Sequence, residues 1–152
     1  MATIYLASPY GFADSTRGFL GEMVARLRAA GHVVNDPWEL GADLIKNMEA
    51  GGKDERRLHE MNRQLGAMNQ SALDRSDVVV ACLDGPDVDS GTASEVGYAF
   101  ARGKQIVGYR GDFRRTGENE GAAVNLQVQY WIEKSGGRIA TDIDGVLAAI
   151  QA

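Results

Sequence analysis

Five short apolar segments alternate with longer helix-like segments along this chain, and that alternation constrains the fold more than any other feature. The strand-like segments are residues 3–7, 32–35, 78–83, 105–109 and 138–140. Segments with helical periodicity or capping residues follow them, at residues 14–30, 54–75, 92–102, 125–134 and 143–150. Residues 40–52 are ambiguous, because glycines interrupt helical turns there. Strands that alternate with helices predict a parallel sheet covered on both faces.

The predicted architecture is an α/β, flavodoxin-like sheet of five parallel strands in the order 2-1-3-4-5, with helices on both faces. The third strand, residues 78–83, is the most apolar and is expected at the centre. The chain has 152 residues, so we expect a single domain over residues 1–152. In this strand order ligands bind beyond the carboxyl ends of strands 1 and 3, which directs attention to residues 8–12 and 84–91.

Composition and charge argue against several functional classes. Hydrophobic residues make up 44% of the chain and charged residues 24%, which is typical of a globular protein. The net charge of −5 would repel a nucleic-acid duplex or an anionic membrane, so neither is an expected partner. No apolar run is long enough for a membrane helix, and no basic leader precedes the first strand. With one cysteine, Cys82, and no export signal, we expect a cytoplasmic protein.

The loop after the first strand is aromatic. It contains Ser8, Tyr10 and Phe12, and Tyr5 lies within the strand itself. Neither a G-x-G-x-x-G motif nor a P-loop occurs in the chain, so a dinucleotide or triphosphate site is not indicated. A proline and two aromatic side chains favour packing on a flat ring, although Tyr5 and Phe12 are equally compatible with a place in the core.

The segment after the third strand carries the most chemistry. Three aspartates precede a predicted helix, and Glu95 lies near its start, where the helix dipole favours an ionised carboxylate. Such a carboxylate can act as a nucleophile or a base. The alternative is that Thr92-Ala-Ser-Glu95 is a capping box, in which Glu95 bonds back to the Thr92 amide, and spacing alone favours this cap. The aspartates can equally form turns, and no ligand spacing predicts a metal site.

A charged, glycine-rich loop, residues 110–123, follows the fourth strand. A loop of this length in a compact domain is usually functional or mobile. Arg110, Asp112 and Arg114 can order it through charge pairs or form a solvated rim. Asn125 can cap the helix that follows.

These segments resemble the nucleoside 2-deoxyribosyltransferase family over nearly the whole chain. The matching motifs are Ile4-Tyr-Leu-Ala-Ser-Pro, Asp89-Ser-Gly-Thr-Ala-Ser-Glu-Val-Gly-Tyr-Ala and Val124-Asn-Leu. The D-x-G-T-A-x-E-x-G segment is the most specific of the three. The resemblance implies a flavodoxin-like fold, in agreement with the independent prediction. It also implies an enzyme of nucleotide salvage that exchanges the base of a 2′-deoxynucleoside by double displacement through a covalent glycosyl-glutamate.

The resemblance further implies which residues are catalytic. Glu95 would attack C1′ of the deoxyribose and expel the base, and a second base would then attack the same carbon. Tyr5 corresponds to the tyrosine that holds the nucleophile, and Asp89 to the aspartate near the departing base and sugar. Asp89 or a water would protonate the leaving base. No cofactor and no metal are expected.

Five more residues are expected to contact the substrate, which is a small 2′-deoxynucleoside or a free nucleobase. Asn69 falls where some family members carry an aspartate near the base, and Ser8 replaces a glycine common in the family's first turn. Gly91 belongs to the specific motif, and Phe12 is a candidate wall that excludes water. Asn125 matches an asparagine that a neighbouring subunit lends to the 5′ end of the sugar, so the resemblance implies a homo-oligomer, a dimer or a hexamer.

Two other functions are compatible with the sequence. A hydrolase of 2′-deoxynucleoside 5′-monophosphates would need cationic or hydroxyl donors near the first loop. Ser8 is present there, but the nearest basic residue, Arg17, belongs to the following helix. A non-catalytic nucleotide-binding domain on the same fold would leave Glu95 as a helix cap. The residues do not fix a preference for purines or pyrimidines.

Overall fold

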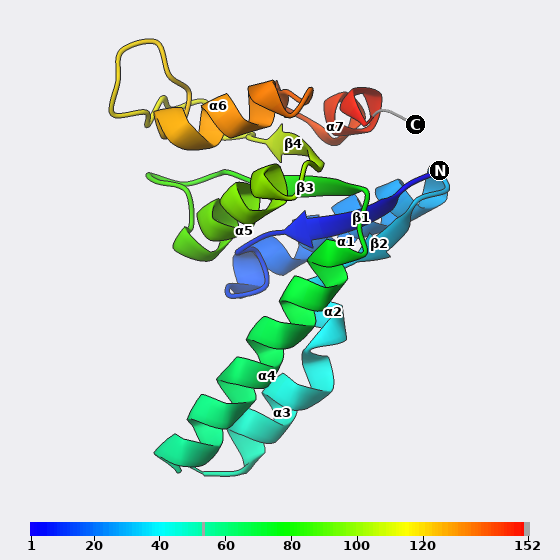
Figure 1. Cartoon of the computed structure of the whole chain (residues 1–152), viewed down its shortest axis with the longest axis vertical. Helices are drawn as coiled ribbons and strands as arrows, with labels where there is room; N and C mark the ends of the chain where they lie inside the picture. The colour runs from blue at the N-terminus through cyan, green and yellow to red at the C-terminus, as the bar shows by residue number, and fades with distance from the viewer. Residues whose placement is uncertain (53, 151–152) are drawn as a thin grey trace.

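Five parallel strands form one sheet in the order β2-β1-β3-β4-β5 (Figure 1). The computed structural model describes residues 1–52 and 54–150. The strands are β1 (Thr3–Ala7), β2 (Val33–Asn35), β3 (Val78–Cys82), β4 (Gln105–Tyr109) and β5 (Ile139–Ala140). All four pairings are parallel, so the predicted flavodoxin-like order is confirmed. β3 lies at the centre and is buried throughout, as expected of a strand with helices on both sides.

Helices connect the strands, and the segment whose structure the sequence left ambiguous, residues 40–52, is mostly helical. They are α1 (Asp14–Ala29), α2 (Pro37–Leu40), α3 (Ala42–Ala50), α4 (Glu55–Asp74), α5 (Ser90–Ala101), α6 (Leu126–Lys134) and α7 (Ile143–Ala149). Residues 40–52 fall mostly in α3, which the short α2 precedes. α2 begins where it does because the Asp36 side chain accepts a hydrogen bond from the Trp38 amide and Pro37 takes the first helical position.

Two hydrophobic clusters, one on each face of the sheet, hold the layers together. Successive side chains of a strand point to opposite faces. Leu6 and Val80 therefore belong to the cluster under α1 and α7, whereas Tyr5 and Val79 belong to the cluster under α5, α6 and the end of α4. This alternation directs Tyr5 toward the helix that carries Glu95.

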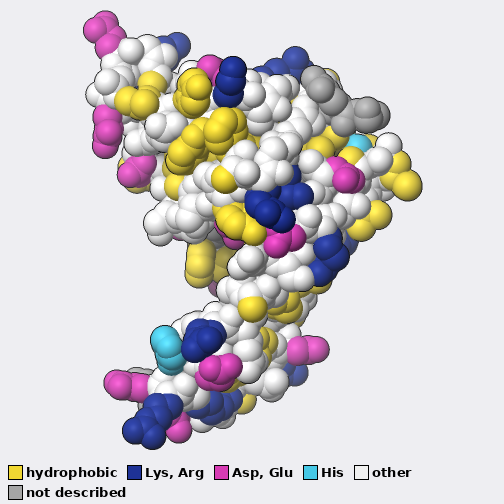
Figure 2. Space-filling model, in the orientation of Figure 1, with side chains coloured by type: hydrophobic (Ala, Val, Ile, Leu, Met, Phe, Trp, Pro, Cys, Tyr) yellow, Lys and Arg dark blue, Asp and Glu magenta, His cyan; other side chains and the backbone are white. Residues whose placement is uncertain are grey.

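Helices α3 and α4 form a hairpin that projects away from the sheet (Figure 1). α4 has 20 residues, which corresponds to a length of about 30 Å. Ala72 and Leu73, in its last turn, are buried against the sheet, and Figure 2 shows charged side chains of both signs at the far end of the hairpin. Within the described part of the chain, no helix is both long and apolar enough to cross a membrane. Residues of this hairpin and of the first-strand loop together line a cavity.

Candidate active site

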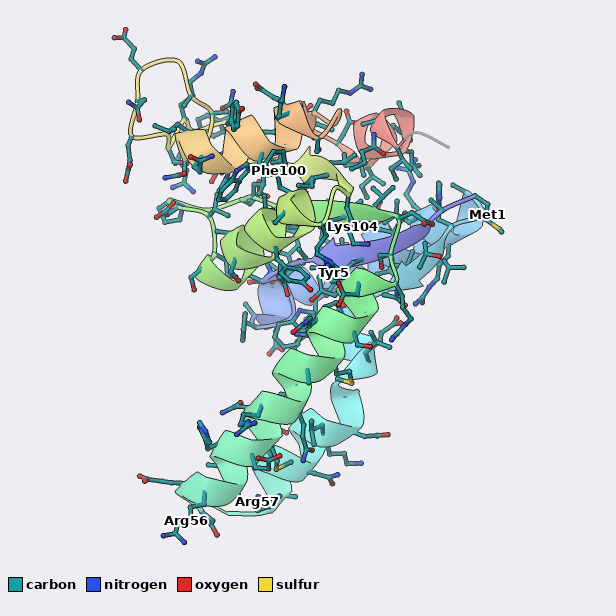
Figure 3. The ribbon with its side chains drawn as sticks, viewed as in Figure 1. Met1, Tyr5, Arg56, Arg57, Phe100 and Lys104 are labelled. Atoms are coloured by element: carbon teal, nitrogen blue, oxygen red, sulfur yellow. The ribbon has the colours of Figure 1, made fainter. Side chains whose placement is uncertain are left out.

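A hydrogen bond between Tyr5 and Glu95 joins strand β1 to helix α5. β1 and β3 are neighbours in the sheet and α5 follows β3 in the chain, so the two residues meet although 90 positions separate them. The Tyr5 hydroxyl donates to Oε1 of Glu95 at 2.5 Å. Tyr5 is fully buried and lies where β1, α4 and α5 come together (Figure 3). The strand therefore holds the Glu95 carboxylate in a fixed position.

The environment of Glu95 makes its carboxyl group unusual. Burial raises the pKa of Glu95 above its ordinary value, the hydrogen bond from Tyr5 lowers it, and the negative charge of Asp89 raises it. Burial is the largest of these effects. Within residues 1–52 and 54–150, no donor contacts the second oxygen, Oε2. A poorly solvated carboxylate that is held through one oxygen can attack with the other.

Helix α5 is capped by Asp89, not by Thr92. The Asp89 carboxylate accepts hydrogen bonds from the Thr92 amide at 2.9 Å and from the Thr92 hydroxyl at 3.3 Å, which is the geometry of an N-cap. α5 starts at Ser90, two residues before the predicted start, and Glu95 lies in its second turn. The capping-box interpretation is therefore wrong, because Asp89 already satisfies the Thr92 amide and Glu95 faces Tyr5.

One cavity borders this carboxylate, and a second, larger cavity shares a lining residue with the first. The lining of the smaller, which measures about 260 Å³, includes Tyr5, Asn69, Ser94 and Glu95. The lining of the larger, which measures about 560 Å³, includes Phe12, Trp38, Met48, Leu65 and Asn69. Asn69 borders both cavities, so they meet at this residue. The larger cavity has the dimensions of a small-molecule site and is mostly apolar.

Phe12 and Trp38 form an aromatic wall of the larger cavity. Their ring centroids are 4.6 Å apart and the rings are nearly perpendicular, at 85°. The Trp38 indole N–H donates to the Ser8 carbonyl at 2.9 Å, and Gly11 packs so close that a Cβ there would lie 2.1 Å from the Trp38 ring. Phe12 is 74% exposed, so it is not a core residue. A flat ring entering this cavity would meet aromatic carbon on one side.

Three residues expected to contact substrate line neither cavity. The Ser8 hydroxyl accepts the amide of Tyr10 at 3.2 Å, and Gly91 lies in the first turn of α5. Asn125 caps α6, as its position in the sequence predicts, and accepts the Gln127 amide at 3.0 Å. Within one chain, the side chain of Asn125 is thus part of helix α6 and not of the cavity walls.

The two loops that follow β3 and β4 are tied to each other. The guanidinium of Arg110, which is only 4% exposed, donates to the carbonyls of Gly85 at 3.3 Å and Arg114 at 2.7 Å. Asp84 accepts the Tyr10 hydroxyl at 2.7 Å, which joins the β3 loop to the first-strand loop. Arg110 is therefore a buried clamp and not part of a solvated rim, and it positions the segment that leads to the α5 cap.

Several cavity residues were missed by sequence reasoning. Trp38 and Met48 lie in or beside the segment whose structure was ambiguous, although Asp36-Pro37 is a recognisable helix start. Arg17, assigned only to the helix after the first loop, borders the larger cavity. Its guanidinium donates to the Gly11 carbonyl at 2.9 Å and pairs with Asp14 at 2.8 Å.

The described residues contain neither a cluster of metal ligands nor an exposed cysteine thiol. Across 1–52 and 54–150, no three His, Cys, Asp or Glu side chains come together in a way that could hold a metal ion. Cys82 is buried in the core of the sheet, as predicted, and burial raises the pKa of its thiol to about 12. A neutral thiol in that position is a small apolar side chain.

Comparison with known sequences gives matches over most of the chain. The profile of the family described as nucleoside 2-deoxyribosyltransferase matches residues 4–127. An uncharacterised protein of Schizosaccharomyces pombe is 28% identical over 155 aligned positions, which cover 95% of this chain and 68% of that protein. The family match includes Tyr5, the whole of α5 and Asn125, the cap of α6.

Solved structures with the same arrangement cover nearly the whole chain. A conserved protein from Enterococcus faecalis is 26% identical with a TM-score of 0.75, covering 98% of this chain and 96% of the other. A 2-deoxyribosyltransferase from Bacillus psychrosaccharolyticus is 25% identical with a TM-score of 0.68, covering 95% and 90%. A CMP N-glycosidase from Clostridium botulinum, at 16% identity and a TM-score of 0.59 over 96% and 95% of the chains, shares the fold.

Proposed function

Because the chain belongs to the nucleoside 2-deoxyribosyltransferase family, we propose that it transfers the 2-deoxyribosyl group from one nucleobase to another by double displacement. The observation that carries this proposal is the Glu95 carboxylate, which Tyr5 holds through one oxygen at the border of a cavity. The substrates are a 2′-deoxynucleoside and a free nucleobase, and the reaction needs no cofactor.

In the first half of the reaction, Oε2 of Glu95 attacks C1′ of the deoxyribose. A bond forms between Oε2 and C1′ as the bond between C1′ and the base nitrogen breaks, and the base leaves with the electron pair. A water supplies the proton that neutralises the leaving base, because the Asp89 carboxylate accepts the Thr92 amide as the cap of α5. The transition state resembles an oxocarbenium ion, so a nearby carboxylate stabilises it before it traps the sugar.

In the second half, a ring nitrogen of the incoming base attacks C1′ from the face that the first base left. The bond between C1′ and Oε2 of Glu95 breaks, the carboxylate is regenerated, and the proton on the attacking ring nitrogen passes to the hydroxide left by the water that protonated the first base. Two inversions at C1′ restore the β configuration. Transfer wins over hydrolysis only if water is kept from the glycosyl-enzyme, and the apolar wall of Phe12 and Trp38 supports that exclusion.

We propose that a second copy of the chain completes the site with Asn125. In one chain Oδ1 of Asn125 is used by the α6 cap, while its amide nitrogen remains a donor that can bind the 5′ hydroxyl of a sugar in a neighbouring subunit. The active form is then at least a dimer.

One observation favours a second function, the hydrolysis of 2′-deoxynucleoside 5′-monophosphates. Arg17 borders the larger cavity, so a cation is nearer to the site than the sequence suggests. Its guanidinium pairs with Asp14 at 2.8 Å, and both side chains are exposed, so this pair is weak and does not exclude a phosphate.

A matrix of donors and acceptors tests both functions. Deoxynucleosides, ribonucleosides and deoxynucleoside 5′-monophosphates are incubated singly with each free base or with none, and products are separated by chromatography. The proposed function predicts new deoxynucleosides that depend on an added base. Release of 2-deoxyribose 5-phosphate and free base from the monophosphates, with no transfer to any base, would support the hydrolase instead.

A further inference from the structure

We infer that Asp84 is a positioning residue of the proposed site: its carboxylate anchors the turn at residues 9–12, which carries Phe12 and packs against Trp38. This inference rests on the proposed function, in which the aromatic wall keeps water from the glycosyl-enzyme. Asp84 lines neither cavity, so it acts through the turn and not by contact with substrate.

Residues 9–12 form a tight turn after β1. The Phe12 amide donates to the Pro9 carbonyl at 3.0 Å, so Tyr10 and Gly11 occupy the two central positions of a β-turn. Tyr10 is only 7% exposed, whereas Phe12 is 74% exposed and borders the larger cavity. The turn therefore directs Tyr10 into the protein and Phe12 toward the cavity, and the Tyr10 side chain is its anchor.

Asp84 accepts this anchor. The Tyr10 hydroxyl donates to Oδ2 of Asp84 at 2.7 Å, and the Tyr10 ring packs edge-on against Phe19 of α1 with centroids 5.9 Å apart. Burial raises the pKa of Tyr10, so its hydroxyl keeps its proton and remains a donor. A hydrogen bond to a carboxylate is stronger than one between neutral groups, which makes this bond the firmest hold on the turn.

Asp84 is itself held in place. Its other oxygen, Oδ1, accepts the Asp112 amide at 2.8 Å. The buried guanidinium of Arg110 donates to the carbonyls of Leu83 and Gly85, the residues before and after Asp84. Asp84 therefore joins the loops that follow β1, β3 and β4, three neighbouring strands, and offers the turn an acceptor that does not move.

The anchored turn is in direct contact with the wall. A Cβ on Gly11 would lie 2.1 Å from the Trp38 ring, and the Trp38 indole donates to the Ser8 carbonyl at 2.9 Å. Phe12 meets Trp38 edge-on, with centroids 4.6 Å apart. A turn that loses its anchor lets the two rings shift, and water then reaches the cavity that they border.

The test compares carboxylates at the two ends of β3. Asp84→Ala removes the anchor. Asp77→Ala is the matched control, because Asp77 directly precedes β3 and its carboxylate accepts the amide of Thr3 in β1 at 2.8 Å. Both variants lose a carboxylate that bridges two elements, but Asp77 lies at the edge of the sheet away from the site. Tyr10→Phe removes only the hydroxyl, and keeps the test open where Asp84→Ala folds poorly.

Two readouts follow the wall. Acrylamide quenching of Trp38 fluorescence reports the exposure of its ring to solvent without any ligand, in a Trp131→Phe background where Trp38 is the remaining tryptophan. The ratio of hydrolysis to transfer, with 2′-deoxynucleosides as donors and free bases as acceptors, reports the water that reaches the glycosyl-enzyme. A merely structural role of Asp84 would lower the midpoint of urea unfolding and leave both readouts of the folded protein unchanged.

In Asp84→Ala and in Tyr10→Phe we expect the quenching constant to rise about twofold and the ratio of hydrolysis to transfer to rise about tenfold. The double variant should add little to either change, because both substitutions break the same bond. Asp77→Ala should match the wild type in both readouts.

Equal quenching in Asp84→Ala and Asp77→Ala, or an equal ratio of hydrolysis to transfer in the two, would overturn the inference. If quenching responds as expected but no protein, the wild type included, transfers a deoxyribosyl group, then the proposed function fails while the link from Asp84 to the wall is upheld.

Discussion

Tyr5 donates a 2.5 Å hydrogen bond to Glu95 from a strand that is 90 positions away in the chain. The bond opposes the effect of burial on the same carboxyl group: burial raises the pKa of Glu95, whereas a donor to the charged form lowers it. Asp89 adds a third effect, because its charge raises the pKa. Conservative substitutions of Tyr5 and Asp89 should therefore shift the pKa of Glu95 in opposite directions.

The pH dependence of kcat/KM should report these two effects. In the proposed mechanism Glu95 attacks C1′ as an ionised carboxylate, so the rate should fall as pH drops through its raised pKa. Tyr5→Phe removes the bond that lowers the pKa, and the acidic limb should move to higher pH. Asp89→Asn removes the neighbouring charge, and the acidic limb of the pH profile should move to lower pH. Measuring kcat/KM across the acidic range for the wild type and the two variants gives the midpoint pH of each acidic limb.

Asp89→Asn is suited to this comparison because asparagine is an equally good helix cap, whereas Asp89→Ala would cost about 1 kcal/mol of helix stability. Urea unfolding should therefore show little change for Asp89→Asn. Limbs that shift in the same direction in both variants would contradict the assignment of Glu95 as the titrating nucleophile.

Gly11→Ala should damage the base site without touching a catalytic group. The new Cβ would lie 2.1 Å from the Trp38 ring, so Trp38 must move and the larger cavity must change shape. We expect KM for the nucleoside to rise about tenfold, the effect of a lost contact of roughly 1.4 kcal/mol. Gly18→Ala is the matched control, because no atom lies within 4 Å of a Cβ there, and it should keep the wild-type KM.

Phe12→Ala should raise the ratio of hydrolysis to transfer. Phe12 covers one side of the larger cavity beside Trp38, and its removal should admit water to the proposed glycosyl-enzyme. Phe113→Ala serves as control, because Phe113 is 94% exposed on the 110–123 loop. Free deoxyribose and transferred nucleoside are quantified in the same reaction. An equal ratio in both variants would show that Phe12 does not keep water out.

Mixing two inactive variants tests whether subunits share a site. Asn125→Asp keeps a capping oxygen for α6 but loses the amide donor, and Glu95→Gln loses the nucleophile. If Asn125 of one copy completes the site of another, a mixed oligomer contains some sites with both native residues. We expect activity to return after the variants are unfolded and refolded together. Mixtures that stay as inactive as the separate variants would place Asn125 outside the site.

The strands could be predicted because a strand that is buried on both faces is a short, nearly continuous run of apolar residues. β1 and β4 have the predicted bounds, and the apolar run at residues 78–83 marked the central strand. The order of the strands was predicted because five parallel strands that alternate with helices suggest the flavodoxin-like arrangement.

The contacts of the site could not be predicted from local spacing. Thr92 and Glu95 have capping-box spacing, but Asp89 is three residues before Thr92 and competes for the same amide. Asp89 accepts the Thr92 amide, whereas Glu95 accepts the hydroxyl of Tyr5, which is far away in the sequence. Trp38 was missed for a similar reason, because its place beside Gly11 depends on packing between α2 and the first-strand loop.

The most direct test of the account is the intact mass of the protein after incubation with a deoxynucleoside and no acceptor base. We predict an added mass of one deoxyribosyl group, located by peptide mapping on the peptide that contains Glu95, and its loss when a free base is added. Glu95→Gln, which keeps an acceptor for the Tyr5 hydroxyl, should show no added mass and no transfer. Base exchange at the wild-type rate by Glu95→Gln would contradict the account.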